Sequence, residues 1–87
     1  MSQYVVLVEA DFRSSNLNYR IRRSDTLPHA EARALFDRVV RGDEPELLKA
    51  KEDSLLVRTA DNQVCRFWTG ISKGESMDRI TLAPVAV

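Results

Sequence analysis

The chain has 87 residues, of which 44% are hydrophobic and 30% are charged, and its 13 basic residues balance its 13 acidic ones. This length fits a single domain over residues 1–87, and the composition excludes wholesale disorder and a fibrous repeat. No apolar stretch approaches the roughly 20 residues that cross a bilayer, and no basic segment precedes the first apolar run. We therefore expect a cytoplasmic protein without a targeting signal, and the single cysteine, Cys65, which cannot form an internal disulfide, agrees with a reducing compartment.

The first predicted strand covers residues 3–9 and contains the run Tyr-Val-Val-Leu-Val. Side chains alternate between the two faces of a strand, so Tyr4, Val6 and Val8 need one cover and Val5 and Leu7 need another. One amphipathic helix can cover only one of these faces. We expect the other cover to come from a short second helical segment, a second copy of the chain or a different partner.

A second strand is predicted around residues 17–22, because Leu17, Tyr19 and Ile21 alternate with polar residues as in a half-buried strand. The polar residues between positions 11 and 16 are typical of a turn. We therefore expect the first two strands to form an antiparallel hairpin with a loop of about six residues.

An amphipathic helix is predicted next, with Thr26 as its N-cap and Pro28 in its first turn, where a missing N–H has no intrahelical partner. Gly42 is the expected C-cap. Apolar residues recur at helical spacing while charged residues occupy the other side. The apolar stripe consists of Ala32, Leu35, Phe36, Val39 and Val40.

Residues 44–51 predict a second, short helix, because Asp43 and Glu46 have the spacing of a capping box and Pro45 suits a first turn. Its apolar residues are too few to cover a sheet face. An acidic loop is the alternative interpretation of this segment.

Residues 54–60 and 63–69 predict a hairpin about the turn residues Asp61 and Asn62, which favour positive φ angles. A regular two-residue turn divides the hairpin side chains between two faces. One face is expected to carry Leu55, Val57, Thr59, Val64, Arg66 and Trp68, and the other Leu56, Arg58, Ala60, Gln63, Cys65 and Phe67.

A loop over residues 70–76 and a last strand over residues 77–83 complete the predicted order, with Pro84 marking an edge or an exit from the sheet. The order is β-β-α-(α)-β-β-β. It indicates an α+β fold, in which a small, mainly antiparallel sheet of about four to five strands carries one amphipathic helix on one face.

The sequence contains no set of residues that is typical of an active site. His29 is expected to be a surface or capping side chain, and Cys65 a small buried hydrophobic residue. One histidine and one cysteine cannot build a zinc site, the acids are not spaced as in a calcium loop, and the glycines form no phosphate-binding motif. We therefore expect a non-enzymatic protein without a metal or cofactor.

The candidate interaction surface combines arginines with aromatic residues. Its members are Tyr19, Arg20, Arg22, Arg58, Arg66, Phe67 and Trp68. Since this composition is enriched at protein interfaces, we predict a small regulatory or protein-interaction module, either a homodimer or an accessory protein of the phage or mobile-element type docked on a larger protein. The alternative is a nucleic-acid-binding domain that uses an arginine-rich strand face, although the formal net charge of zero weighs against it.

Overall fold

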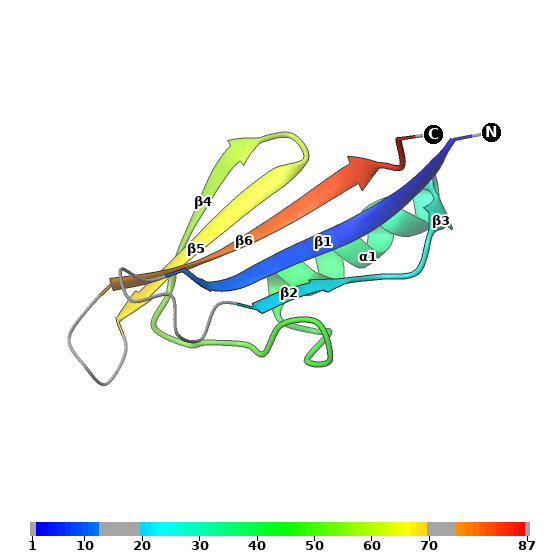
Figure 1. Cartoon of the computed structure of the whole chain (residues 1–87). Helices are drawn as coiled ribbons and strands as arrows, with labels where there is room; N and C mark the ends of the chain where they lie inside the picture. Colours follow the sequence, from blue (N-terminus) through cyan, green and yellow to red (C-terminus); the bar gives the residue numbers. More distant parts are fainter. Residues whose placement is uncertain (1, 13–19, 70–74, 87) are drawn as a thin grey trace.

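The computed structural model describes residues 2–12, 20–69 and 75–86. Within these residues one helix, α1 (His29–Arg41), packs on one face of an antiparallel sheet (Figure 1). The strands are β1 (Gln3–Phe12), β2 (Arg20–Arg23), β3 (Leu27–Pro28), β4 (Leu55–Ala60), β5 (Gln63–Thr69) and β6 (Glu75–Pro84). The predicted α+β fold is confirmed.

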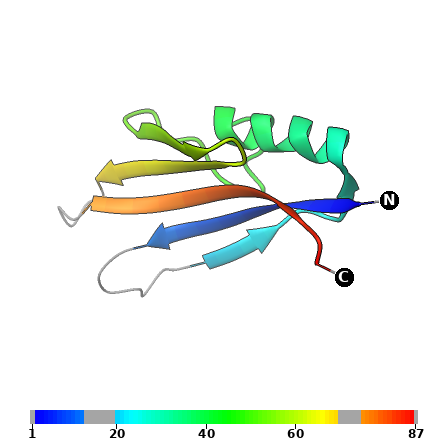
Figure 2. The same ribbon diagram turned by 90° about the horizontal axis from the view of Figure 1, so that it is seen from above.

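The sheet has the order β2-β1-β6-β5-β4, and the two-residue strand β3 pairs with the start of β1. The first and last strands therefore lie side by side in the middle of the sheet, and both ends of the chain lie at the same end of it (Figure 1 and Figure 2). The predicted last strand is confirmed, and β6 ends at Pro84. Residues 70–74 of the predicted loop lie outside the described residues, and its last two residues, Glu75 and Ser76, belong to β6 instead.

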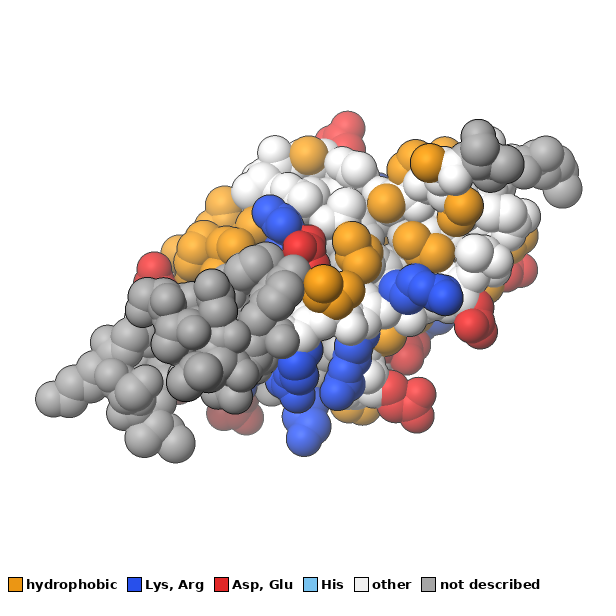
Figure 3. Space-filling view, in the orientation of Figure 1, with side chains coloured by type: hydrophobic (Ala, Val, Ile, Leu, Met, Phe, Trp, Pro, Cys, Tyr) orange, Lys and Arg blue, Asp and Glu red, His pale blue; other side chains and the backbone are white. Residues whose placement is uncertain are grey.

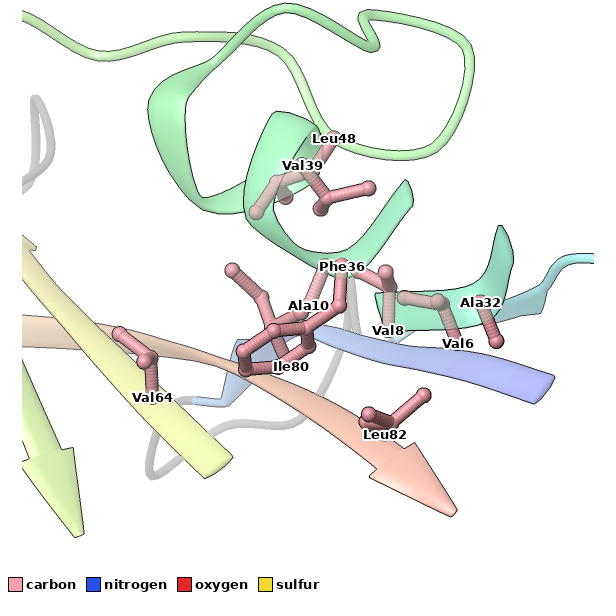
Figure 4. Close-up of a cluster of buried hydrophobic side chains, with 10 residues drawn as sticks. All are labelled: Val6, Val8, Ala10, Ala32, Phe36, Val39, Leu48, Val64, Ile80 and Leu82. Carbon is pink, nitrogen blue, oxygen red and sulfur yellow. The ribbon is translucent and has the colours of Figure 1, made fainter. Parts of the chain in front are cut away.

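The hydrophobic core lies between α1 and the strands β1 and β6 (Figure 4). Phe36 is fully buried and extends from the helix onto Ile80 of the sheet. The predicted helical stripe is confirmed, with Leu35 and Val40 partly buried at its margins. The cluster comprises Val6, Val8, Ala10, Ala32, Phe36, Val39, Leu48, Val64, Ile80 and Leu82.

The helix begins at His29, later than its predicted N-cap, Thr26. Pro28 occupies the N-cap position with φ of −57° and ψ of 154°, and no side chain caps the helix there. Leu27 and Pro28 pair with the first residues of β1, which holds this segment extended, and the fixed φ of proline suits that conformation. The predicted N-cap was wrong because tertiary strand pairing outweighs the local capping preference.

Within the described residues, no helix is both long enough and apolar enough to cross a membrane.

Gly42 ends the helix as predicted, in the left-handed conformation with φ of 85°. Its N–H donates to the Val39 carbonyl over 3.1 Å, and the N–H of Asp43 donates to the Arg38 carbonyl over 2.9 Å, which is the Schellman pattern. A Cβ atom at position 42 would lie only 2.9 Å from the Cβ of Ala50. Both the backbone angle and the close contact therefore require glycine.

Replacing Gly42 with alanine is expected to lower the free energy of unfolding, measured by urea denaturation. The left-handed φ alone costs a residue with a Cβ about 1 to 2 kcal/mol, and the contact with Ala50 adds to this cost. The double variant Gly42→Ala/Ala50→Gly removes the contact but keeps the angle, so it should recover part of the loss. A Gly42→Ala variant as stable as the wild type would contradict the left-handed helix end.

Residues 44–51 do not form the predicted second helix. They contain a single turn, in which the N–H groups of Leu47 and Leu48 both donate to the Glu44 carbonyl, over 3.1 and 3.0 Å. Leu48 is buried in the core near α1 (Figure 4). Leu47 is partly buried and packs against the core cluster. Tertiary packing holds these leucines at the core, and the capping-box spacing of Asp43 and Glu46 is therefore not followed by a helix. The loop interpretation of this segment is the correct one.

The predicted second strand is described only from Arg20 onward. β2 covers Arg20–Arg23, and positions 17–19 lie outside the described residues. Its antiparallel pairing with β1 is confirmed, with Leu7 opposite Arg23 and Glu9 opposite Ile21. The predicted half-buried position of Ile21 was wrong, because this side chain lies on the sheet face that α1 does not cover and is 61% exposed.

Candidate interaction surface

The residues of the predicted interaction surface lie on different strands, and Tyr19 lies outside the described residues. The edge strand β2 carries Arg20 and Arg22, the opposite edge strand β4 carries Arg58, and β5 carries Arg66, Phe67 and Trp68. Strands β1 and β6 separate β2 from β5, a distance of about 14 Å at the usual strand spacing. Across the described sheet, these residues do not form one continuous face.

The two arginines of β2 point to the helix side of the sheet. Arg20 lies opposite Ala10 and Arg22 lies opposite Val8, and both of these partners face the core. The guanidinium of Arg22 donates a hydrogen bond to the Glu46 carbonyl over 2.7 Å. Arg22 therefore helps to hold the segment that follows α1 against the edge of the sheet.

An irregularity in the β4–β5 hairpin places the side chains of β4 on the opposite faces from those predicted. Arg58 pairs with Val64 and Ala60 pairs with Gln63, so Thr59 is an extra residue, as in a β-bulge. One extra residue shifts the register by one and exchanges the two faces of the strand. The helix side carries Leu56, Arg58, Val64, Arg66 and Trp68, and the other side carries Leu55, Val57, Cys65 and Phe67.

Arg66 and Asp78 form a buried ion pair on the helix side of β5 and β6. Their Nη2 and Oδ2 atoms are 2.7 Å apart, and the two residues are only 5% and 1% exposed. Trp68 Nε1 donates to the same carboxylate oxygen over 2.9 Å, and Arg66 Nη1 donates to the Lys49 carbonyl over 2.8 Å. The Lys51 ammonium lies 4.1 Å from the centre of the Trp68 ring. These contacts hold residues 49–51 against the part of the sheet beyond α1.

Arg66 and Trp68 therefore stabilise the fold, and their partner Asp78 was missed by the sequence analysis. The available signal was the alternation along the last strand, because Asp78 shares a face with Ile80 and Leu82. A carboxylate on a buried face needs a basic partner that is also buried. The corrected hairpin register supplies that partner.

The face of the sheet opposite α1, which we call the open face, carries apolar side chains from both edges and from the central strands. Most of them are half-buried by their neighbours in the sheet, and no described helix or strand lies over them. Figure 3 shows this face, with hydrophobic side chains spread over it among the charged groups. Its apolar residues are Val5, Leu7, Ile21, Leu55, Val57, Cys65, Phe67, Met77 and Ala83.

An ion pair joins β1 and β6 across the open face. Nε and Nη2 of Arg79 donate to the two carboxylate oxygens of Glu9, each over 2.9 Å. This bidentate pairing fixes both side chains and compensates their charges. Ile21 lies opposite Glu9 and Cys65 lies opposite Arg79, so apolar residues border the pair on both sides. The open face therefore combines apolar residues with a charge-compensated pair, and it also carries polar residues such as Arg23 and Thr81, which lie on either side of Leu7.

The edge strand β4 forms a second exposed apolar surface. All of its residues are exposed, and Leu55, Leu56 and Val57 are exposed to 64%, 48% and 38%. Because side chains alternate, these three residues present apolar groups on both faces of the strand. Edge strands usually carry charge or proline that discourages pairing with another strand, whereas the only charged residue of β4 is Arg58.

His29 and Cys65 pack against neighbouring residues. The His29 ring meets the Tyr4 ring edge-on, with ring centres 4.7 Å apart, and Cys65 is a buried free thiol on β5. In the described ranges, no group of three or more His, Cys, Asp or Glu side chains is placed to hold a metal ion. The exposed apolar surfaces are the features of these ranges that point to a function.

Comparisons with protein-family models, curated proteins and solved structures found no match to this chain. Its function is therefore inferred from the chemistry of the open face and of β4.

Proposed function

We propose that the protein is a small, non-enzymatic interaction module that docks on a partner protein through the open face. The observation that supports this proposal is the set of apolar side chains that no described element covers on this face. An antiparallel sheet with one solvated face usually shows polar residues there, whereas Val5 and Leu7 occupy the central strand β1. Large apolar patches on small proteins are typical of interaction sites.

The residue types on the open face suit a protein partner. Phe67 and Met77 lie opposite each other on β5 and β6, and aromatic residues and methionine are enriched at protein interfaces. The Glu9–Arg79 pair offers polar groups that fix the orientation of a partner without adding net charge. A partner that fits this face has an apolar surface with a few hydrogen-bonding groups near its centre.

We also propose that the protein acts in the cytoplasm as a regulatory or accessory protein. Cys65 is a free thiol, which suits a reducing compartment. The small size of the chain is consistent with a module that modifies the behaviour of a larger protein.

Nucleic-acid binding is the less favoured alternative. It requires arginines and aromatic rings that line one continuous groove or face. Here Arg22 donates to a loop carbonyl, Arg66 is buried against Asp78, and β2 and β5 are separated by two other strands. The geometry therefore supports docking on a protein better than binding along a phosphate backbone.

Ala83→Arg is expected to weaken docking at least about tenfold, or about 1.4 kcal/mol, because it adds a bulky charge to the open face beside Val5 in place of a single methyl group. Tagged protein is used to capture partners from its native host, and the captured partner is purified and titrated by calorimetry. Wild-type protein should bind it saturably.

Ala34→Arg is the matched control, because it adds the same side chain to the exposed side of α1. It should bind the partner as tightly as the wild type, and circular dichroism with thermal melts verifies that both variants fold. Equal binding by both variants, or no specific partner for the wild type, would count against docking through the open face.

A further inference from the structure

We infer that a second copy of this chain pairs with β4 in the antiparallel direction, about a two-fold axis at Leu56, so that two sheets join into one. This inference rests on the proposed function of the protein as an interaction module, and it identifies one of its partners. It concerns the backbone edge of β4, whereas the proposed docking surface is the open face, to which β4 contributes the side chains of Leu55 and Val57.

The tip of the β4–β5 hairpin is fastened to the rest of the fold. The Asp61 carbonyl accepts hydrogen bonds from Arg33 of α1 over 2.9 Å and from Arg58 over 3.0 Å. Asn62 exchanges hydrogen bonds with the backbone of Leu82, with its carbonyl accepting over 2.8 Å and its side-chain amide donating over 3.1 Å. Strand β4 is therefore held in position, and pairing with another strand requires little ordering of the chain.

The apolar residues of β4 match one another in one antiparallel register. A two-fold axis perpendicular to the sheet keeps each face on its own side, so only residues of the same face can lie opposite each other. In the register centred on Leu56, this residue faces its own copy, and Leu55 faces Val57 in both directions. In the register centred on Val57, Leu56 instead faces Arg58, which places an apolar side chain against a charge.

Charges at the two ends of β4 also complement each other in the register centred on Leu56. The chain enters β4 through Glu52 and Asp53 and reaches Arg58 near the other end. Antiparallel pairing puts Arg58 of one copy opposite Ser54 of the other, beside Asp53. An acidic residue of one copy thus lies near a basic residue of the other at both ends of the paired strands, and the two Arg58 side chains stay apart. This self-complementarity favours a second copy over an unrelated strand.

The joined sheet has a consequence for the open face. Because the two-fold axis preserves the faces, both open faces lie on the same side of the dimer and both helices lie on the other. A pairing of about five residues per strand is a small interface, so we expect a dissociation constant on the order of micromolar. The dimer would present a partner with two open faces in one surface.

Analytical ultracentrifugation across the micromolar range tests the inference, and the wild type should show a reversible monomer–dimer equilibrium. Leu56→Lys places two ammonium groups against each other at the axis and should weaken the dimer at least about tenfold. Ala34→Lys is the control, because it adds the same charge to the exposed side of α1, away from β4 and from the open face, and it should dimerise like the wild type.

Cysteine cross-linking tests the register. Facing residues of paired strands have Cα atoms about 4.5 to 5.5 Å apart, which lies within the range of about 4.4 to 6.8 Å that a disulfide spans. Leu56→Cys should therefore form a covalent dimer on a non-reducing gel. Val57→Cys, which faces Leu55 in the second copy, should not.

A wild type that stays monomeric, a dimer insensitive to Leu56→Lys, or equal cross-linking by Val57→Cys would overturn the inference. Binding of a foreign protein that Leu56→Lys abolishes while the wild type stays monomeric would also overturn it, because β4 would then take another strand. The Ala83→Arg titration is independent of these measurements, so failure of the dimer is distinguishable from failure of docking through the open face.

Discussion

Asp78→Leu is expected to lower the free energy of unfolding by about 3 to 5 kcal/mol, as measured by urea denaturation. The substitution leaves the guanidinium of Arg66 without its carboxylate partner at a site that is only 5% exposed. It also removes the acceptor of the Trp68 indole N–H. A loss of this size is a large part of the total stability of a small domain.

Two variants separate the effect of an uncompensated charge from the effect of a lost contact. The double variant Arg66→Met/Asp78→Leu removes both charges and should recover much of the stability, because apolar side chains of similar volume suit a buried site. Asp37→Leu breaks the exposed pair with Arg33, whose atoms are 3.9 Å apart, and should cost less than about 0.5 kcal/mol. Similar losses for Asp78→Leu and Asp37→Leu would show that the Arg66–Asp78 pair is not buried.

Phe36→Ala is expected to lower the free energy of unfolding by about 3 to 5 kcal/mol, because it leaves a cavity between the helix and the sheet. Phe36 is 0% exposed, and its ring packs where the side chains of β1 and β6 meet the helix (Figure 4). The guanidinium of Arg33 also lies over the Phe36 ring, 5.4 Å from the ring centre. Thermal denaturation followed by circular dichroism measures the loss.

Phe67→Ala is the matched control, because it removes the same side chain from the half-buried open face. Its cost should be less than half that of Phe36→Ala, since the truncated site is open to water and no closed cavity forms. Equal losses would indicate that the open face is packed as tightly as the core, and they would weaken the proposed docking surface.

Local patterns predicted the parts of this fold that depend on neighbouring residues. The spacing of Ala32, Phe36 and Val39 placed the helix, and Gly42 placed its end, since both signals act within one or two helical turns. Alternation and turn residues placed the hairpin of β4 and β5. The position of β6 between β1 and β5 depends on contacts between distant segments, so no local pattern predicts it.

The errors have specific physical causes. The extra residue Thr59 exchanged the faces of β4, and a bulge of this kind leaves no clear mark in the sequence. The capping signals near Asp43 were overridden because Leu48 is drawn into the core. Pairing with β1 displaced the start of α1 from Thr26. The described members of the predicted arginine surface lie on separate strands, and local sequence patterns carry no information about the strand order that separates them.

The central position of β6 determines when the protein can fold during synthesis. β1 is made first, yet its main partner in the sheet is β6, which ends at Pro84. Until that strand leaves the ribosome, Val6 and Val8 can meet α1 but lack Ile80 and Leu82, so part of the core stays open to water. Closing a sheet between strands so far apart in sequence is slow, and the nascent domain is exposed to misassociation until β6 has been made.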